Sequence, residues 1–285
     1  MLMRLLNYVI PSFQMNRFLF FILITIVVAS CQTKGASDPV IDKTPVSFGD
    51  NELFKRICLE RYDIDADGVL TVYECEKVNE LDVSARNLYS LKGIENFTKL
   101  ETLFCYDNLI SDLDVSALKK LKYLYCNNSN VHNLNVTGCS ELLILDAHYN
   151  FLETLDVTSC SKMFLLSICF NPRLKEIDLS ACCALGTLYC QSCSLTSLDL
   201  SVCGRLIGLH CWGNQLTELN LEGCSSLMDL WCGDNNLFSL DLTSCPDKMQ
   251  YISCPRNPGL MRIYLREGQT ASSIELSAST GITYK

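Results

Sequence analysis

The repeated phrase of this 285-residue chain is clearest over residues 206–224, LIGLHCWGNQLTELNLEGC. Other copies of the phrase align on its second leucine, Leu209. Neighbouring copies lie 21 or 22 residues apart, and the aligned positions are Leu81, Leu103, Leu124, Leu145, Ser167, Leu188, Leu209, Leu230, Ile252 and Ile274. A short period that persists over most of a chain predicts a stack of similar coils, which bury one continuous core between them.

Each copy follows the pattern L-x-x-L-x-L/C-x-x-N-x-L. At a period of about 20–29 residues, this pattern is typical of leucine-rich repeats. From about Leu81 to Tyr284 the chain resembles that family, in particular its short-repeat, internalin-like members. The resemblance implies an α/β solenoid, a right-handed coil with a parallel β-sheet on its concave side. A coil of 21 residues leaves little room for an α-helix. We therefore expect extended or 3₁₀ structure on the convex side, with bulges near Lys162-Met163 and Lys248-Met249.

Asparagine recurs three residues after the central Cys of the phrase. At this bend the amide is expected to hydrogen-bond backbone groups of neighbouring coils, which would otherwise be buried without partners. The residues concerned are Asn108, Asn150, Asn214, Asn235 and Asn257.

Most of the 18 cysteines fall into two sets with the period of the repeat. The first set fills an inward strand position, with Ala147 as its one small substitute: Cys105, Cys126, Cys169, Cys190, Cys211, Cys232 and Cys254. The second set fills an inward position of the return segment: Cys139, Cys160, Cys182, Cys203, Cys224 and Cys245. Free Cys behaves as a small apolar residue, so we predict reduced core thiols. Disulfides and metal binding are the alternatives, and Cys183 and Cys193 lie outside both sets.

The N-terminal segment differs from the repeats. Arg4 and Arg17 precede an apolar run over residues 18–29, and small residues lead into Cys31. A basic start, a short apolar stretch and small residues before a cleavage point describe a secretory signal, and their position directly before a Cys resembles a bacterial lipobox. We predict a signal peptide over 1–30, acylation of Cys31 and a flexible tether over 31–50. This places the protein at the outer membrane, on its cell-surface or periplasmic face. An uncleaved anchor and plain secretion are the alternatives, and the start is either Met1 or Met15.

A loop between the tether and the repeats has the spacing of an EF-hand. The pattern D-x-D-x-D-G-x₅-E places possible oxygen ligands at alternating positions around a sharp glycine turn. The expected ligands are Asp63, Asp65, Asp67, the Val69 carbonyl, Thr71 and Glu74. We predict one structural Ca²⁺ in a helical cap over 51–80 that covers the first coil of a solenoid over 81–285. The alternative is an acidic turn that merely resembles the loop.

Aromatic residues gather at the predicted outward positions of the sheet. Side chains alternate along a strand, so the residues before and after each inward Cys face outward. The candidate partner-binding residues are Phe104, Tyr106, Tyr125, His148, Phe170, Tyr189, His210, Trp212 and Trp231. Tyr and Trp are enriched at binding hot spots, and these rings favour a binding face. The alternative is aromatic stacking that only stabilises the sheet.

The sequence favours a binding protein over an enzyme. His210 and Cys211 are adjacent on one strand and point to opposite faces, and no hydrolase, metalloprotease or phosphate-loop motif occurs. A net charge of −9 without basic clusters argues against nucleic acid. We predict a monomeric, non-catalytic lipoprotein that binds a protein or glycoprotein through its concave face, similar to leucine-rich repeat lipoproteins of the Bacteroidetes type. A structural envelope scaffold and a glycan-binding accessory lipoprotein are the alternatives.

Overall fold

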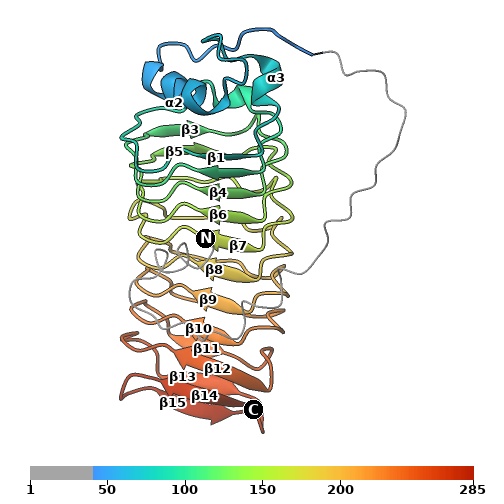
Figure 1. The fold of residues 1–285 in the computed structure, drawn as a ribbon. Coiled ribbons are helices and arrows are strands. Elements are labelled where there is room, and N and C mark those ends of the chain that lie inside the picture. Colours follow the sequence, from blue (N-terminus) through green and yellow to red (C-terminus); the bar gives the residue numbers. More distant parts are fainter. Residues whose placement is uncertain (1–40) are drawn as a thin grey trace, which may run out of the picture. The chain divides into compact units, whose positions relative to one another are not determined.

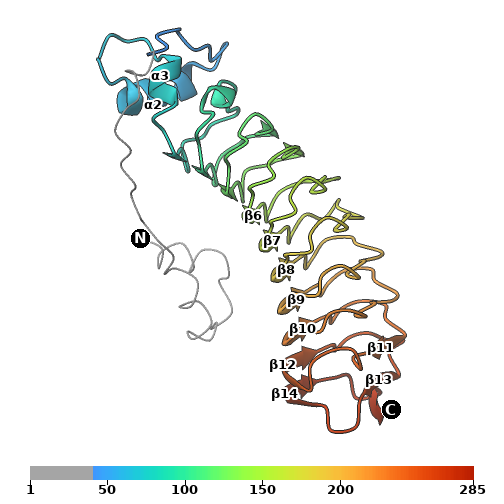
Figure 2. The same ribbon diagram turned by 90° about the vertical axis from the view of Figure 1, so that its right-hand side faces the viewer.

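The structure is a computed structural model that describes residues 41–285 (Figure 1). The predicted signal peptide, Cys31 and the first part of the predicted tether lie outside the described residues. Residues 41–285 form one curved solenoid with a small helical cap at its N-terminal end (Figures 1 and 2). Neither α-helix of this part of the chain has the length and apolar character needed to cross a bilayer.

One parallel sheet runs the whole length of the solenoid and lies on its concave side (Figure 2). Consecutive coils contribute consecutive strands, so no strand crosses over another. In sheet order the strands are β1 (Glu80–Asp82), β2 (Thr102–Phe104), β4 (Tyr123–Tyr125), β6 (Ile144–Asp146), β7 (Leu165–Ser167), β8 (Thr187–Tyr189), β9 (Gly208–His210), β10 (Asp229–Trp231), β12 (Lys248–Ser253) and β14 (Thr270–Glu275). The predicted parallel sheet is therefore confirmed.

The convex side consists of extended segments and turns, as predicted for so short a coil. Two small parallel sheets form there, β3 (Asp112–Asp114) with β5 (Asn133–Asn135), and β11 (Ser239–Asp241) with β13 (Arg262–Leu265) and β15 (Gly281–Tyr284). One 3₁₀ turn, η1 (Ile94–Asn96), lies in the first coil.

The sheet register confirms the repeat alignment except at one coil. Leu145 pairs with Leu166, not with Ser167. The predicted bulge near Lys162-Met163 is therefore wrong. The extra residue lies beyond Asn171, in a turn where the Leu174 N–H donates to the Asn171 carbonyl at 3.0 Å. The strand is apolar on both faces, with Leu165 and Cys169 on one and Leu166 and Ile168 on the other, so the sequence alone permits both registers. Ile168 fills the inward position instead, and Cys169 moves to the outward side of the sheet.

Asparagines bridge neighbouring coils as predicted. The Asn214 amide donates to the carbonyls of Cys190 and Cys211, both at 2.9 Å, and accepts from the Leu195 N–H at 3.0 Å. Asn171 makes the equivalent bonds and belongs to the same row. Cys193, which lies outside both predicted cysteine sets, fills this row too and donates its thiol to the Ile168 carbonyl at 3.2 Å.

The cap begins earlier than the predicted boundary at residue 51. Backbone hydrogen bonds join residues 42–46 to residues 70–73 in antiparallel fashion. Phe48 is buried against Phe54 of helix α2 (Glu52–Tyr62), and Phe54 in turn contacts Phe97 of the first coil. Helix α3 (Val72–Cys75) then leads into β1. Residues 42–50 are thus part of the cap and not of a flexible tether.

All 17 cysteines of the described chain are free thiols, and all except Cys183 are buried. Both predicted rows lie in the core, with Cys169 and Ile168 exchanged as described above. Burial raises the pKa of most of the buried thiols, to about 12 for Cys211 and about 11 for Cys224.

Candidate functional site

The concave face is formed by three outward positions in each coil: the residue before the inward leucine, and the residues one and three after it. Eight of the nine predicted partner-binding residues occupy these positions. Phe170 does not, because the corrected register places it one residue further, in a left-handed turn with φ 57°. Its ring nevertheless reaches this face and lies 6.1 Å from the ring of Trp212.

The aromatic rings form contacts from coil to coil. Phe104 stacks on Tyr125 with a centroid distance of 5.0 Å. A longer line follows from β8 to β12, where centroid distances are 4.8 Å for Tyr189–His210, 5.8 Å for His210–Trp231 and 6.1 Å for Trp231–Tyr251. Phe104, Tyr189 and His148 are buried, whereas the other predicted residues are half-buried. The rings therefore support one another and still present part of their surface.

Burial controls the charge of these groups. The pKa of His210 falls to about 4 because burial disfavours the charged imidazole. Burial, with a smaller contribution from Asp229, raises the pKa of Tyr189 to about 12. The face therefore presents a neutral imidazole and neutral phenols at physiological pH.

Asp146, His148 and Cys169 meet in the middle of the face as a result of the corrected register. His148 Nδ1 lies 2.5 Å from an Asp146 carboxylate oxygen, and both side chains are buried. Burial and, to a smaller extent, Asp146 raise the pKa of Cys169 to about 12. A thiol is a nucleophile only as thiolate, so this group is a weak candidate for covalent chemistry at neutral pH.

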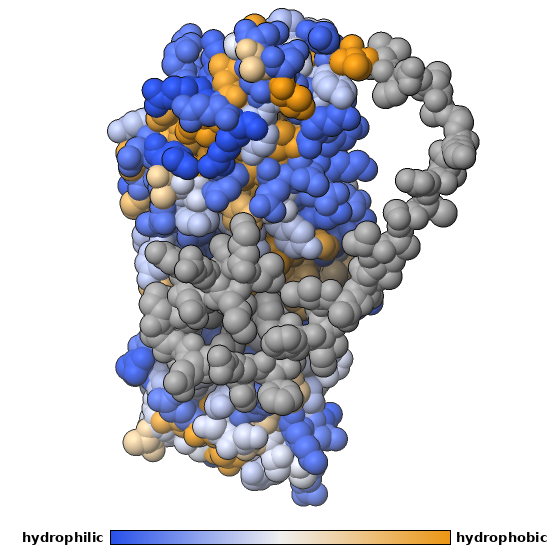
Figure 3. All heavy atoms as spheres, in the orientation of Figure 1, coloured by the Kyte–Doolittle hydropathy of each residue, from blue (hydrophilic) through white to orange (hydrophobic). Residues whose placement is uncertain are grey.

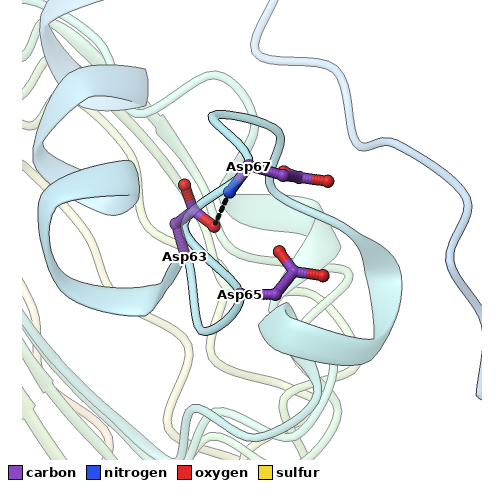
Figure 4. A group of neighbouring side chains, drawn as sticks. All are labelled: Asp63, Asp65 and Asp67. Carbon is purple, nitrogen blue, oxygen red and sulfur yellow. Dashed lines mark hydrogen bonds between the residues drawn. The ribbon is translucent and has the colours of Figure 1, made fainter.

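The acidic loop brings three of its predicted ligands together (Figure 4). One oxygen each from Asp63, Asp65 and Asp67 lies within 4.8 Å of the others. Two of these carboxylates also brace the loop: Asp63 accepts from the backbone N–H groups of Asp67 and Gly68, and Asp67 accepts from the Val69 N–H at 2.7 Å. Asp65 faces Lys43 at 3.7 Å.

Glu74, the last residue of the predicted EF-hand spacing, caps the helix that follows the loop. Its carboxylate accepts from the Thr71 N–H and hydroxyl at 2.9 and 2.7 Å and from the Ile64 N–H at 2.7 Å, and it forms a capping box for α3. Burial disfavours its charge, but these hydrogen bonds hold its pKa below the ordinary value. Glu74 is not part of the cluster of three aspartates.

Solved structures share this architecture at low sequence identity. The functional domain of InlJ from Listeria monocytogenes, described as including a cysteine ladder, has 22% identity and a TM-score of 0.59. The fold is a leucine-rich repeat solenoid. This chain covers 63% of that structure, which in turn matches 84% of this chain. A leucine-rich repeat protein of Leptospira interrogans has 19% identity and a TM-score of 0.55, over 73% of this chain and 55% of its own.

An internalin C2 structure from Listeria monocytogenes has 17% identity and a TM-score of 0.50, over 87% of this chain and 100% of its own. No curated protein sequence matches the leucine-rich repeat chain. Residues 15–32 match the model of the prokaryotic membrane lipoprotein lipid attachment site. This segment contains Cys31 and indicates a membrane-anchored lipoprotein.

Sequence reasoning missed one row of the concave face, the residue before each inward leucine. It includes Tyr123, Asp229 and Tyr251, of which Tyr251 is 42% exposed. Strand alternation alone could have found this row, because positions two residues apart share a face. Figure 3 shows apolar residues lying among hydrophilic ones on the visible part of this side of the solenoid.

Proposed function

We propose that this protein is a non-catalytic, membrane-anchored lipoprotein that binds a protein or glycoprotein through its concave face. The main support is the line of four rings from Tyr189 to Tyr251, which crosses four adjacent strands of the concave sheet. A leucine-rich repeat solenoid offers such a face as an extended binding surface. Half-buried aromatic rings provide large contact areas at little cost in conformational entropy.

The lipid attachment site supports a membrane anchor, and we propose that this anchor holds the protein at the outer membrane, on its cell-surface or periplasmic face. We propose that residues 1–30 are removed, that Cys31 is acylated, and that a tether shorter than 31–50 joins the lipid to the cap. Metabolic labelling with palmitate tests this arrangement. Label should enter the wild-type protein, and the Cys31→Ala variant should remain unlabelled.

The test of binding is a screen of purified extracellular proteins and glycoproteins against the wild type and a Trp212→Ala/Trp231→Ala variant. The matched control is Tyr89→Ala/Phe238→Ala, which removes two rings that are more than half exposed outside the concave face. Binding should disappear only in the concave variant while its circular dichroism stays native. If no partner binds and the concave variant only melts earlier, the rings serve as a structural scaffold. Competition by free sugars would instead indicate the glycan-binding alternative.

We also propose one structural Ca²⁺ at the acidic loop, held by Asp63, Asp65 and Asp67 with the Val69 carbonyl, Thr71 and Glu74 completing the shell. The proximity of three carboxylates supports this proposal, because they repel one another without a cation. Asp65 is the best residue to change, since its carboxylate faces the exposed Lys43 and, unlike those of Asp63 and Asp67, accepts no backbone N–H of the described loop. Millimolar calcium should raise the melting temperature of the wild type by several degrees, and this rise should vanish in Asp65→Asn. An equal rise in both proteins would contradict the site.

A further inference from the structure

We propose that Asp229, with the rings of Trp231 and Tyr251, forms a seat for an Arg or Lys side chain of a protein partner on the concave face. This inference rests on the proposed function and specifies the chemistry of the partner. Asp229 and Trp231 are two residues apart on β10 and share one face, and Tyr251 is the register neighbour of Asp229 on β12. The seat thus contains one carboxylate and two aromatic rings from adjacent strands.

The concave face is free of Lys and Arg throughout the described coils. Its three outward positions carry five acidic residues instead: Glu80, Asp82, Asp146, Asp229 and Glu275. Two cations that flank these positions, Lys122 and Arg256, are each paired with an acidic side chain. Lys122 contacts Glu101 at 2.9 Å, and Arg256 contacts Asp234. With a chain net charge of −9, the face attracts a basic partner over a distance of about one Debye length, roughly 8–10 Å.

Asp229 differs from the other acids in its surroundings. Asp146 has His148 as partner, and Glu275 accepts a hydrogen bond from the Ser253 hydroxyl at 2.7 Å. Asp229 is half-buried, and its buried Oδ1 has no hydrogen-bond partner within the described chain. Burial alone raises its pKa. A partly desolvated carboxylate gains most from a cation that replaces the lost water.

On β9, no side chain stands beside Asp229 in its row. Its register neighbour on β9 is Gly208, which has no side chain, and the next residue in that row is Thr187. A Cβ at Gly208 would meet Thr187 Cγ2 at 3.5 Å, an ordinary contact. Ile207 and Met228, both half-buried, lie directly before Gly208 and Asp229. The carboxylate is thus bordered on β9 by a residue without a side chain, and two apolar side chains lie next to its row.

A cation explains the seat better than a sugar hydroxyl. A hydroxyl would satisfy the hydrogen bond of Oδ1 but would leave the negative charge of the carboxylate uncompensated. Arg and Lys compensate the charge and also interact favourably with the faces of Trp and Tyr rings. Arg adds a planar fork that matches a carboxylate.

Tryptophan fluorescence provides a direct readout, because both tryptophans of the chain lie on the concave face. In the full-length Trp212→Phe protein, held in detergent, Trp231 is the one remaining indole. The probes are short peptides from a library with a central Arg and varied apolar neighbours. The best binders are then resynthesised with citrulline, the neutral isostere of Arg, at the centre.

Three further changes are compared in this protein. Asp229→Asn keeps the shape of the seat but removes its charge, and Asp199→Asn removes a charge from the convex side as a control. Gly208→Val fills the space beside Asp229 with a residue that favours strands. Native circular dichroism and melting temperature confirm that each variant is folded.

The proposal predicts that Arg peptides change Trp231 fluorescence and bind at least about tenfold more tightly than their citrulline forms, with a preference that weakens as salt increases. Asp229→Asn and Gly208→Val should abolish this preference, and Asp199→Asn should retain it. Equal binding of Arg and citrulline peptides, an unchanged preference in Asp229→Asn, or no binder below about 1 mM would overturn it. An Asp229-dependent response to neutral methyl glycosides would instead assign the seat to sugars. A macromolecular partner that requires Trp231 but ignores Asp229→Asn would refute the seat and leave the proposed function intact.

Discussion

His210 holds a neutral imidazole between Tyr189 and Trp231 on the concave face. Its pKa in the folded protein is about 4 because it is buried, whereas a histidine of an unfolded chain titrates near 6.5. Between these values the unfolded chain binds a proton that the folded chain does not. The titration of His210 therefore lowers the free energy of unfolding as pH decreases from about 6.5 to about 4. Above about pH 6.5 this contribution does not change with pH.

We predict that His210→Phe lacks this part of the pH dependence. The contribution of His210 amounts to about 3 kcal/mol over the whole window. Urea unfolding of the wild type and the variant at about pH 7 and about pH 5 measures about 2 kcal/mol of this contribution. The wild type should lose more stability between the two conditions. Parallel losses in both proteins would contradict a buried neutral imidazole at this position.

Asn214 illustrates how single residues hold the coils together. Asn214→Leu would leave the carbonyls of Cys190 and Cys211 and the Leu195 N–H without their partner. We predict a loss of about 3 kcal/mol or more. Asn214→Ser should cost less, because Ser129 occupies the same row and donates to the Cys105 carbonyl at 3.1 Å. Chemical denaturation distinguishes the two variants, and equal losses would argue against the amide bonds as the cause.

At this scale the sequence predicts most of the core but not its ambiguous points. The periodic leucines predict the register wherever one leucine stands alone. At Leu165-Leu166 both residues satisfy the pattern, and the Asn171 hydrogen bonds to two coils decide between them. The aromatic residues of the face follow from strand alternation. Their burial does not, because it depends on how rings of neighbouring coils stack, as for Tyr189 beside His210.

Among the elements, the cap depends on residues that composition alone assigns to a tether. Phe48 is buried against Phe54, and the Val46 N–H donates to the Leu70 carbonyl at 2.9 Å. We predict that a fragment beginning at residue 41 is more stable than one beginning at residue 51. Loss of the buried Phe48 ring alone should lower the free energy of unfolding by about 3 kcal/mol or more. Phe48→Ala in the longer fragment tests that contribution. Equal melting temperatures of the two fragments would show that the segment does not belong to the cap.

The two cysteine rows are elements of the core rather than of a disulfide framework. We predict that in the folded fragment over residues 41–285 one thiol, that of the exposed Cys183, reacts rapidly with Ellman's reagent. In denaturant, all 17 thiols of the fragment should react. Buried thiols of raised pKa react slowly because little thiolate is present. Cys183→Ser should remove the rapid phase. Fewer than 17 reactive thiols in denaturant without reductant would reveal disulfides.

The sequence could not place the boundary of the cap for a physical reason. Residues 42–48 have no periodic pattern, and their order comes from pairing with residues 70–73 of the acidic loop region. Similarly, the EF-hand spacing correctly brings Asp63, Asp65 and Asp67 together. It does not reveal that Glu74 caps α3, because capping boxes and calcium loops both use a Glu three residues after a Thr.

The molecule as a whole is a stack in which each coil contacts its neighbours, so its stability and its binding surface both extend along one direction. Because the coil is short, the convex side consists of turns and extended segments, whereas the concave sheet carries the aromatic rings and the Asp229 carboxylate. This division predicts which side meets a partner. Two asparagines allow the two sides to be compared as attachment points for a cross-linker: Asn127 lies on the concave face and Asn220 on the convex side.

The most direct test is photo-cross-linking from these two positions in cells that display the lipid-anchored protein. A benzophenone amino acid replaces Asn127 in one strain and Asn220 in the other. Our account predicts that a discrete partner is captured from position 127, is not captured from position 220, and is lost when Trp212→Ala/Trp231→Ala is added. Capture of the same partner from position 220 alone, or equally from both positions, would contradict binding through the concave face.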